Sequence, residues 1–384
     1  MKNKRISYFD LAKGIGIILV VLGHMENIDV GLRTWISSFH MPLFFMISGM
    51  LMAAKREQEG NTVDVYIKKA KGIIIPYMWF SIIYVPIDIM NLYIHHIDEH
   101  TFVQNILDSC TFAGISVMWF LPALFIAEIV AVYIIRKISE VKTKLDSRIL
   151  TFFAGVLTMA IAYAAWTFIR PYYDAYSYSY ILGTLLGFIR VILRGLVMST
   201  HVINGFITFS IIKEVEEKYL SAKGNEQKAI LSLKGYSIAL GVILLVINMG
   251  LCMKNGAVDN HFLTLNNAFL YYICATLGSY AIIFISKGLD SIKPVDYLGR
   301  NSLIIMATHL QCYLLYAGIL VAIAIDAYVT RAKSYVYMFN SVLFTMLFEL
   351  IVIVVINKFF PFITGKGSIK DLFKIVKKEQ NSVH

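Results

Sequence analysis

Charged residues are scarce in this sequence. Only 16% of its 384 residues are Asp, Glu, Lys or Arg, against roughly 25% in an ordinary soluble domain, and this shortage excludes a soluble enzyme. The chain has seven prolines and no low-complexity tract, which excludes a disordered or fibrous protein. Most of what remains is apolar, since 58% of the residues are hydrophobic and the mean hydropathy is +0.67. The sequence therefore predicts an integral membrane protein.

Cysteine is also rare. The four residues are Cys110, Cys252, Cys274 and Cys312, and no two of them have CxxC spacing. Neither a metal site nor a disulfide framework is predicted. One bridge, between Cys110 and Cys252, stays open because both fall on the outer side of the topology given below.

Long apolar runs dominate the chain. A helix that crosses ~30 Å of hydrocarbon needs about 20 mostly apolar residues, and ten segments qualify. The sixth is over-long and carries Arg190 and Arg194, so a tilted helix, a broken helix and a span plus an interfacial segment are all open. No small-x-small cleavage site follows Leu22, so we expect the first segment to be retained. The segments are 9–26, 36–54, 72–94, 117–136, 149–169, 180–212, 236–253, 268–286, 302–325 and 338–360.

The Lys and Arg residues predict the orientation, because basic loops stay on the cytoplasmic side. With ten spans and both termini cytoplasmic, 28 of the 35 lie inside, five outside and two within the membrane. The net charge of +10 is then mostly a topology signal, and no nucleic-acid partner is expected. The basic inner rim would attract anionic lipid or a polyanionic ligand.

No soluble domain interrupts the bundle. The fold class is therefore an all-α integral membrane protein, a multi-pass bundle of about ten transmembrane helices in the cytoplasmic membrane. Residues 1–365 form the transmembrane domain and residues 366–384 a basic cytoplasmic tail. Any chemistry must come from the helices, where polar residues are costly and are candidates for function.

The first helix carries one polar stripe. Lys13 and His24 are eleven residues apart, which places them within about 20° of one face and about 16 Å apart along the axis. Asp10 shares the stripe and can pair with Lys13. In one interpretation Lys13 reaches the inner headgroups and His24 marks the outer end of the span. In the other, the cation holds an anionic cofactor at the inner mouth and the imidazole acts as a base at the far end.

A second histidine stands at the start of the second span. Pro42 suits a first helical turn, and His40 just before it would lie near His24 on the outer rim. Two imidazoles could converge there. Ser48 and Gly49 further along are ordinary small packing residues of a membrane helix.

Four segments resemble the signature motifs of a known family. They resemble, in order and in helix count, the acyltransferase-3 family of multi-pass bacterial membrane O-acyltransferases. The resemblance spans nearly the whole chain. The segments are Asp10 to Gly14 with His24, Ser38 to Gly49, Trp119 to Leu124, and Leu298 to Leu303 leading to His309.

The resemblance implies transfer of an acyl group, usually acetyl from acetyl-CoA, to a hydroxyl of a cell-envelope glycan or its lipid-linked precursor. The family's functional pair is a cation followed by histidine, which maps onto Lys13 and His24. A basic cluster that enters the third helix maps onto Lys68, Lys69 and Lys71. The family usually has arginines at these cationic positions. Lysine keeps the charge but loses bidentate phosphate recognition.

The residues themselves suit that chemistry. CoA carries several phosphate charges, and the inner rim offers the lysines to neutralise them, although plain positive-inside retention explains the cluster as well. The pantetheine arm could follow the stripe of the first helix, so that its thioester arrives near His24. The imidazole would then take the acceptor's proton or carry the acyl group itself. No metal is expected.

Several weaker candidates have two interpretations each. Trp119 is an interfacial anchor or lines the active site, and His309 is an interior histidine or touches the cofactor. Glu128 and Glu349 within the helices need partners, for which Arg190 and Arg194 are the natural choice; catalysis is the alternative for either carboxylate. An outer aromatic belt, or a platform that stacks on a sugar ring, is formed by Tyr172, Tyr173, Tyr176, Tyr178 and Tyr180.

A second function stays open. Charged residues within ten spans also suit a transporter or flippase for a small solute or a lipid-linked sugar. The resemblance allows this too, because family-like domains are found fused to serine racemases. Against it, the halves show no inverted repeat. Transport should survive loss of His24, whereas acyl transfer should not.

Overall fold

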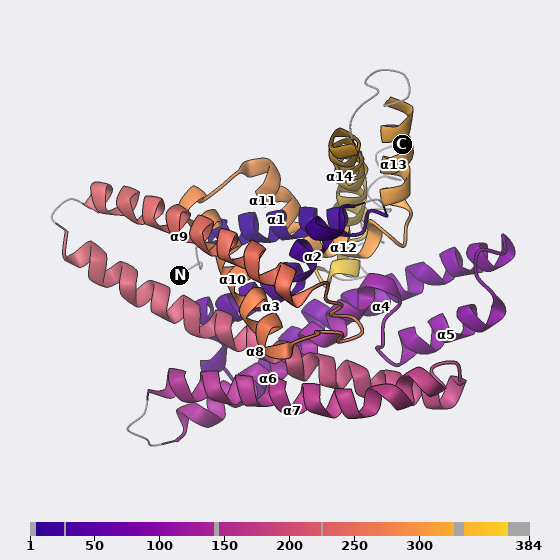
Figure 1. Ribbon diagram of the computed structural model, residues 1–384, viewed down its shortest axis with the longest axis horizontal. Helices are drawn as coiled ribbons and strands as arrows, with labels where there is room; N and C mark the ends of the chain where they lie inside the picture. Colours follow the sequence, from indigo (N-terminus) through magenta and orange to yellow (C-terminus); the bar gives the residue numbers. More distant parts are fainter. Residues whose placement is uncertain (1–4, 27, 142–145, 224–225, 326–333, 368–384) are drawn as a thin grey trace, which may run out of the picture. The chain divides into compact units, whose positions relative to one another are not determined.

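The computed structural model describes residues 5–26, 28–141, 146–223, 226–325 and 334–367 (Figure 1). Within these ranges the chain is helical, and apart from an isolated bridge between Asp259 and Thr264 no strand forms there. The predicted all-α class is confirmed, while most of the predicted tail, residues 368–384, lies outside the described residues. The helices are α1 (Ser7–Gly23), α2 (Val30–Ser37), α3 (His40–Ala54), η1 (Glu57–Glu59), α4 (Thr62–Tyr93), α5 (Glu99–Cys110), η2 (Ser116–Trp119), α6 (Phe120–Ser139), α7 (Ser147–Tyr176), α8 (Tyr180–Ser221), α9 (Glu226–Asn255), α10 (Ala268–Leu289), α11 (Lys293–Arg300), α12 (Ser302–Thr308), α13 (Leu314–Ile325), α14 (Ser334–Phe359) and η4 (Pro361–Thr364).

The chain forms two compact units. The first unit comprises residues 1–65 and 123–302, and the second comprises residues 66–122 and 303–384. Within the first unit, α1 packs on α11, α3 and α7 pack on α8, and α9 packs on α10. Within the second, α13 packs on α14.

Eight helices of the described chain are long and apolar enough to span a membrane. Two of the ten predicted spans do not reach that length. The first, 9–26, is α1 with 17 residues. The ninth, 302–325, is divided between α12 and α13 by a turn that begins at His309. The multi-pass architecture is thus supported, while the count of ten and the side of the termini stay predictions.

The over-long sixth segment is one unbroken helix. α8 has 42 residues, which at 1.5 Å per residue is about 63 Å. The broken-helix alternative is therefore wrong. A helix of this length must tilt or extend beyond ~30 Å of hydrocarbon.

Two crossings in the first unit depend on glycine. A Cβ at Gly49 of α3 would overlap the carbonyl of Val202 on α8, so Gly49 is the small packing residue that the sequence indicates. A Cβ at Gly299 of α11 would overlap the carbonyl of Asp10 on α1, and one at Gly14 would overlap Val295. Small residues let helix backbones approach closely. The two motif glycines, Gly14 and Gly299, thus hold α11 against α1.

Candidate active site

Three charged side chains meet at the start of α1. The carboxylate of Asp10, only 4% exposed, accepts hydrogen bonds from Nε and Nη2 of Arg5 at 2.5 and 3.1 Å. The Nζ of Lys13 lies 3.1 Å from the same carboxylate, so the predicted pairing of Asp10 with Lys13 is confirmed. Because one carboxylate binds two cations, the cluster keeps a net positive charge. The Lys13 side chain stays 21% exposed.

A pocket of about 330 Å³ opens beside this cluster. It lies where α11 crosses α1, and three cations and two carboxylates line it. One carboxylate, Asp10, is held by Arg5. The other, Asp296, accepts from the Ser291 hydroxyl and the Ile292 N–H. The lining residues are Arg5, Ser7, Asp10, Ser291, Lys293, Asp296 and Arg300.

From the sequence, Arg5, Lys293 and Arg300 are only part of the basic inner rim, and no site is predicted at them. One signal was present, because Arg300 lies within the Leu298 to Leu303 motif. Nothing local, however, connects that motif to Arg5 almost 300 residues earlier.

A second contact holds the start of α1 in place. The Ser7 hydroxyl donates to Asp290, which directly follows α10, at 2.5 Å, and Lys234 of α9 lies 3.3 Å from the same carboxylate. The hydrogen bond from Ser7, together with Lys234 and Lys287, holds the pKa of Asp290 below its usual value. The pocket is therefore built on three elements rather than on α1 alone.

His24 and His40 lie together at the other end of α1. The Nδ1 of His24 bonds the carbonyl of Val20, and that of His40 bonds the carbonyl of Ile36, both at 2.8 Å. A carbonyl only accepts, so each Nδ1 carries the proton, and Nε2 is the accepting nitrogen of the neutral ring. The His24 ring is near enough for its charge to act on His40. Nε2 of His24 is thus set up to receive a proton.

The loop between α9 and α10, residues 256–267, lies at this same end. Asp259 and Arg33 are both close enough to His24 to act on its charge. The Nδ2 of Asn260 is 3.4 Å from the carbonyl of Ser37, at the end of α2. We call His24, His40 and this loop the His24 end of the first unit. From the sequence this loop is only a connection between two helices, and no functional role is predicted for it.

One helix connects the two ends. Residues 7–23 form a single α-helix with His24 as its C-cap. The separation of about 16 Å between Lys13 and His24 along the axis follows directly. A cation and an imidazole therefore stand at opposite ends of one stripe.

The acidic candidates have hydroxyl partners. Glu128, 5% exposed, accepts a hydrogen bond from the Ser48 hydroxyl. Glu349 in the second unit is bonded by Thr308 at 2.8 and 3.0 Å. Arg190, which we expected to pair with such a carboxylate, lies instead against aromatic rings, as described below. The ion-pair prediction for Arg190 is therefore wrong.

Five predicted site residues belong to the second unit, and four of them lie on or just before α4 and α6. Lys68 and Lys71 are exposed on α4, and Lys69 is partly buried. Trp119, 7% exposed, packs edge-to-face on Phe120 with 6.3 Å between ring centroids, at the entrance to α6. How these side chains relate to Lys13 and His24 stays a prediction.

His309 also lies in the second unit. It is fully buried, in agreement with the interior interpretation. Its Nδ1 donates to the carbonyls of Ile305 and Met306 at 2.8 and 2.9 Å. The imidazole thus satisfies carbonyls at the end of α12, where the helix stops. A contact with the cofactor stays a prediction.

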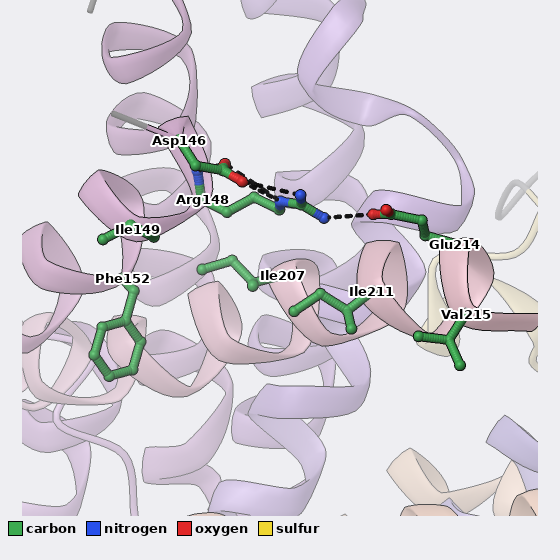
Figure 2. A pocket seen from close by; sticks show the side chains of 8 residues that line it. All are labelled: Asp146, Arg148, Ile149, Phe152, Ile207, Ile211, Glu214 and Val215. Atoms are coloured by element: carbon green, nitrogen blue, oxygen red, sulfur yellow. Dashed lines mark hydrogen bonds and ion pairs between the residues drawn. The ribbon is translucent and has the colours of Figure 1, made fainter. Parts of the chain in front are cut away.

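A larger hollow, about 450 Å³, lies between α7 and α8 (Figure 2). Its walls are mainly Ile, Phe and Val, and its polar rim is Asp146, Arg148 and Glu214. Figure 2 shows Arg148 bound to both carboxylates, each at 2.9 Å. The guanidinium holds the pKa of Asp146 below its usual value. Two carboxylates against one guanidinium leave this rim net negative, so the hollow suits an anionic substrate less than the smaller pocket does.

A family model described as an acyltransferase domain matches residues 6–356. The chain belongs to the acyltransferase-3 family. The match covers α1, α3, α6 and α11, which carry the four motif segments, and it agrees with the resemblance read from them. No solved structure matches the chain.

Two curated proteins are similar to parts of this acyltransferase-family chain. An amino-acid racemase of Enterococcus faecalis is 26% identical over 157 residues, which cover 39% of this chain and 21% of the racemase. The nodulation protein NolL of Sinorhizobium fredii is 48% identical over 59 residues, which cover 13% of this chain and 16% of that protein. The chain thus matches only about a fifth of the length of either relative.

The cysteines have no described role in this acyltransferase-family chain. All four are free, so the bridge between Cys110 and Cys252 is not formed. Among the residues that the structure describes, no group of three His, Cys, Asp or Glu side chains is placed to hold a metal ion. The groups best placed for chemistry in the first unit are the imidazoles at the His24 end.

Proposed function

We propose that the protein transfers an acyl group, acetyl above all, from cytoplasmic acyl-CoA to a hydroxyl of a cell-envelope polysaccharide or a lipid-linked glycan. The observation that carries the proposal is His24. Its Nδ1–H is held by the Val20 carbonyl and its Nε2 can accept, at the end of the helix whose other end carries Lys13. The family match supports a membrane acyltransferase.

The acyl-CoA donor would bind in the pocket beside Arg5, where α11 crosses α1. Arg5, Lys293 and Arg300 line a space of about 330 Å³, and guanidinium groups suit phosphate because they donate two parallel hydrogen bonds. Lys13 lies next along the stripe, held by Asp10. The pantetheine arm would span the remaining distance of about 16 Å to His24. Lys68, Lys69 and Lys71 stay proposed contacts from the second unit.

His24 would act as the general base. Nε2 takes the proton of the acceptor hydroxyl as its oxygen bonds to the thioester carbonyl carbon. The carbon–sulfur bond breaks, and the imidazolium returns the proton to the leaving CoA thiolate. In the alternative, Nε2 itself receives the acyl group and passes it on. Both routes need Nε2 unprotonated and Nδ1 anchored.

The test uses purified protein in nanodiscs with acetyl-CoA radiolabelled in the acetyl group. We expect slow thioester loss or protein labelling in the wild type and neither in His24→Ala. The matched control is His96→Ala, which removes an exposed histidine of the second unit and should behave as the wild type. Equal turnover in His24→Ala and the wild type would refute the base assignment. Failure of all three proteins to bind acetyl-CoA would refute the donor.

A transporter or flippase is the second candidate. The racemase similarity and the interrupted α12–α13 segment favour it, because broken helices form transport sites in membrane proteins. Uptake of serine or flipping of a labelled lipid-linked sugar by vesicles that contain His24→Ala would support this candidate. Acetyl-CoA turnover that depends on His24 would exclude it as the main activity.

A further inference from the structure

Arg190 of α8 is a buried cation held by rings. It is 3% exposed, and its Cζ lies 4.4 Å from the ring centroid of Tyr173 and 4.8 Å from that of Phe262. Its Nε and Nη1 are buried and have no hydrogen-bond partner. A buried guanidinium normally binds a carboxylate or another acceptor, because the loss of water is otherwise uncompensated. The two rings offset only part of that loss.

Two carboxylates lie close in sequence to the rings that cover Arg190, and both are engaged elsewhere. Asp174, on the same helix as Tyr173, pairs with Arg170 at 3.6 Å. Asp259 accepts from the backbone N–H groups of His261 and Phe262 at 2.7 and 3.1 Å. Among the described residues, none therefore accepts from Nε or Nη1 of Arg190, and these two donors are available to a bound group.

Arg190 lies close to the His24 end. The loop residues Asp259 and Asn260 face His24 and Ser37, and the next two residues face the arginines. The carbonyl of His261 accepts from Nη2 of Arg194 at 2.5 Å, and the ring of Phe262 covers Arg190. Consecutive Cα atoms are 3.8 Å apart, so residues 259–262 span at most about 11 Å. One short stretch of loop therefore separates the buried arginine from His24.

The cover over Arg190 is thin. Phe262 is 41% exposed, so one ring separates the guanidinium from the surface. Trp166 anchors the backbone of Phe262 by donating to its carbonyl at 3.1 Å. The ring faces of exposed tyrosines nearby in sequence suit sugars, and these are Tyr172, Tyr176, Tyr178 and Tyr180.

We propose that Arg190 binds an anionic group of the acceptor, a phosphate or a carboxylate, beneath Phe262 and Tyr173. This inference rests on the proposed function, because it treats the His24 end as the place where the acceptor enters. The guanidinium fork presents two donors to either anion. The acceptor would then be a charged glycan or a glycan on a phosphorylated lipid carrier, rather than a neutral sugar.

The test measures binding in phosphatidylcholine nanodiscs, whose headgroups carry no net charge. The probes are farnesyl pyrophosphate with farnesol as its neutral match, and an oligoglucuronate with a neutral oligoglucose. We expect one anionic probe to bind more tightly than its neutral match. Preference for farnesyl pyrophosphate would indicate a phosphorylated lipid carrier, and preference for oligoglucuronate would indicate a charged glycan. Arg190→Gln should weaken binding of the preferred anionic probe by about 10–100-fold. Lys254→Gln removes an exposed cation at the end of α9 and should change it little.

Acetyl-CoA binding is also measured on every variant, so that a failure of this inference can be distinguished from a failure of the proposed function. Unchanged acetyl-CoA binding with lost anion binding in Arg190→Gln supports the inference. Equal anion binding in Arg190→Gln and the wild type refutes it. If Arg190→Gln does not fold, the inference is tested on the wild type alone. Equal affinity of the wild type for the anionic and neutral probes would refute it.

Discussion

Gly299→Ala tests whether the crossing of α1 and α11 builds the donor pocket. The new Cβ would overlap the carbonyl of Asp10 and approach the N–H of Gly14, both main-chain atoms. No side chain can rotate away, so the two helices must separate. Overpacking of this kind costs about 1–3 kcal/mol, and we expect a value near the upper end.

The displacement should also affect binding. Lys293 and Arg300 lie on α11, whereas Arg5 and Asp10 lie at the start of α1, and all four line the pocket. If the helices separate, the cations no longer converge, and we expect acetyl-CoA affinity to fall by about tenfold, the equivalent of about 1.4 kcal/mol. The assays are thermal unfolding in detergent and equilibrium binding of labelled acetyl-CoA.

Gly250→Ala is the matched control. Gly250 is an exposed residue of α9, and a Cβ there would meet no atom within 4 Å. Alanine favours a helix over glycine by about 1 kcal/mol, so this variant should be equally or more stable and bind acetyl-CoA normally. The reasoning fails if Gly299→Ala matches Gly250→Ala in both assays.

Two further predictions concern Lys13 and His261. Lys13→Met should weaken acetyl-CoA binding by about tenfold or more, because it removes the cation proposed to bind phosphate. Lys13→Arg should bind acetyl-CoA as the wild type does. Equal binding by all three proteins would contradict this role of Lys13. Burial, together with Arg194 and Arg190, lowers the pKa of His261 to about 2. The unfolded chain therefore binds a proton as the pH falls through 6.5 that the folded chain does not, and between pH 6.5 and 5.5 stability should fall by about 1 kcal/mol. His261→Asn should remove this part of the acid sensitivity in unfolding measured over that range, and an unchanged pH profile would show that the imidazole is not held neutral.

The proposed chemistry depends on the two ends of α1. A cation cluster at one end suits the phosphates of a CoA ester, and an anchored imidazole at the other suits a hydroxyl acceptor. One continuous helix of 17 residues joins these ends, so in the proposed function the phosphates of the donor and the hydroxyl of the acceptor would bind at opposite ends of α1. Arg190 then adds a charge at the acceptor's side.

The helix break at His309 shows that an apolar run does not predict whether a helix is continuous. Residues 302–325 are apolar enough to predict one span, because hydropathy averages side-chain polarity over a window. Helix continuity depends instead on where each carbonyl finds its donor. The His309 imidazole binds the carbonyls of Ile305 and Met306, and the Tyr84 hydroxyl binds that of Ala307. The Ile305 carbonyl keeps its helical bond from the His309 N–H, whereas the carbonyls of Met306 and Ala307 accept from the side chains of His309 and Tyr84, and α12 ends there.

The sequence by itself determined the membrane class, the long apolar helices and the stripe that joins Asp10, Lys13 and His24. These follow from local rules, since composition sets the solvent and the helical period sets which residues share a face. Only the tertiary structure decided that Arg5 meets Lys293 and Arg300, that the loop 256–267 lies beside His24, and that Arg190 lies between two rings. Such contacts join residues far apart in the chain, and they form where small residues such as Gly14 and Gly299 let two backbones meet. No local pattern encodes that approach.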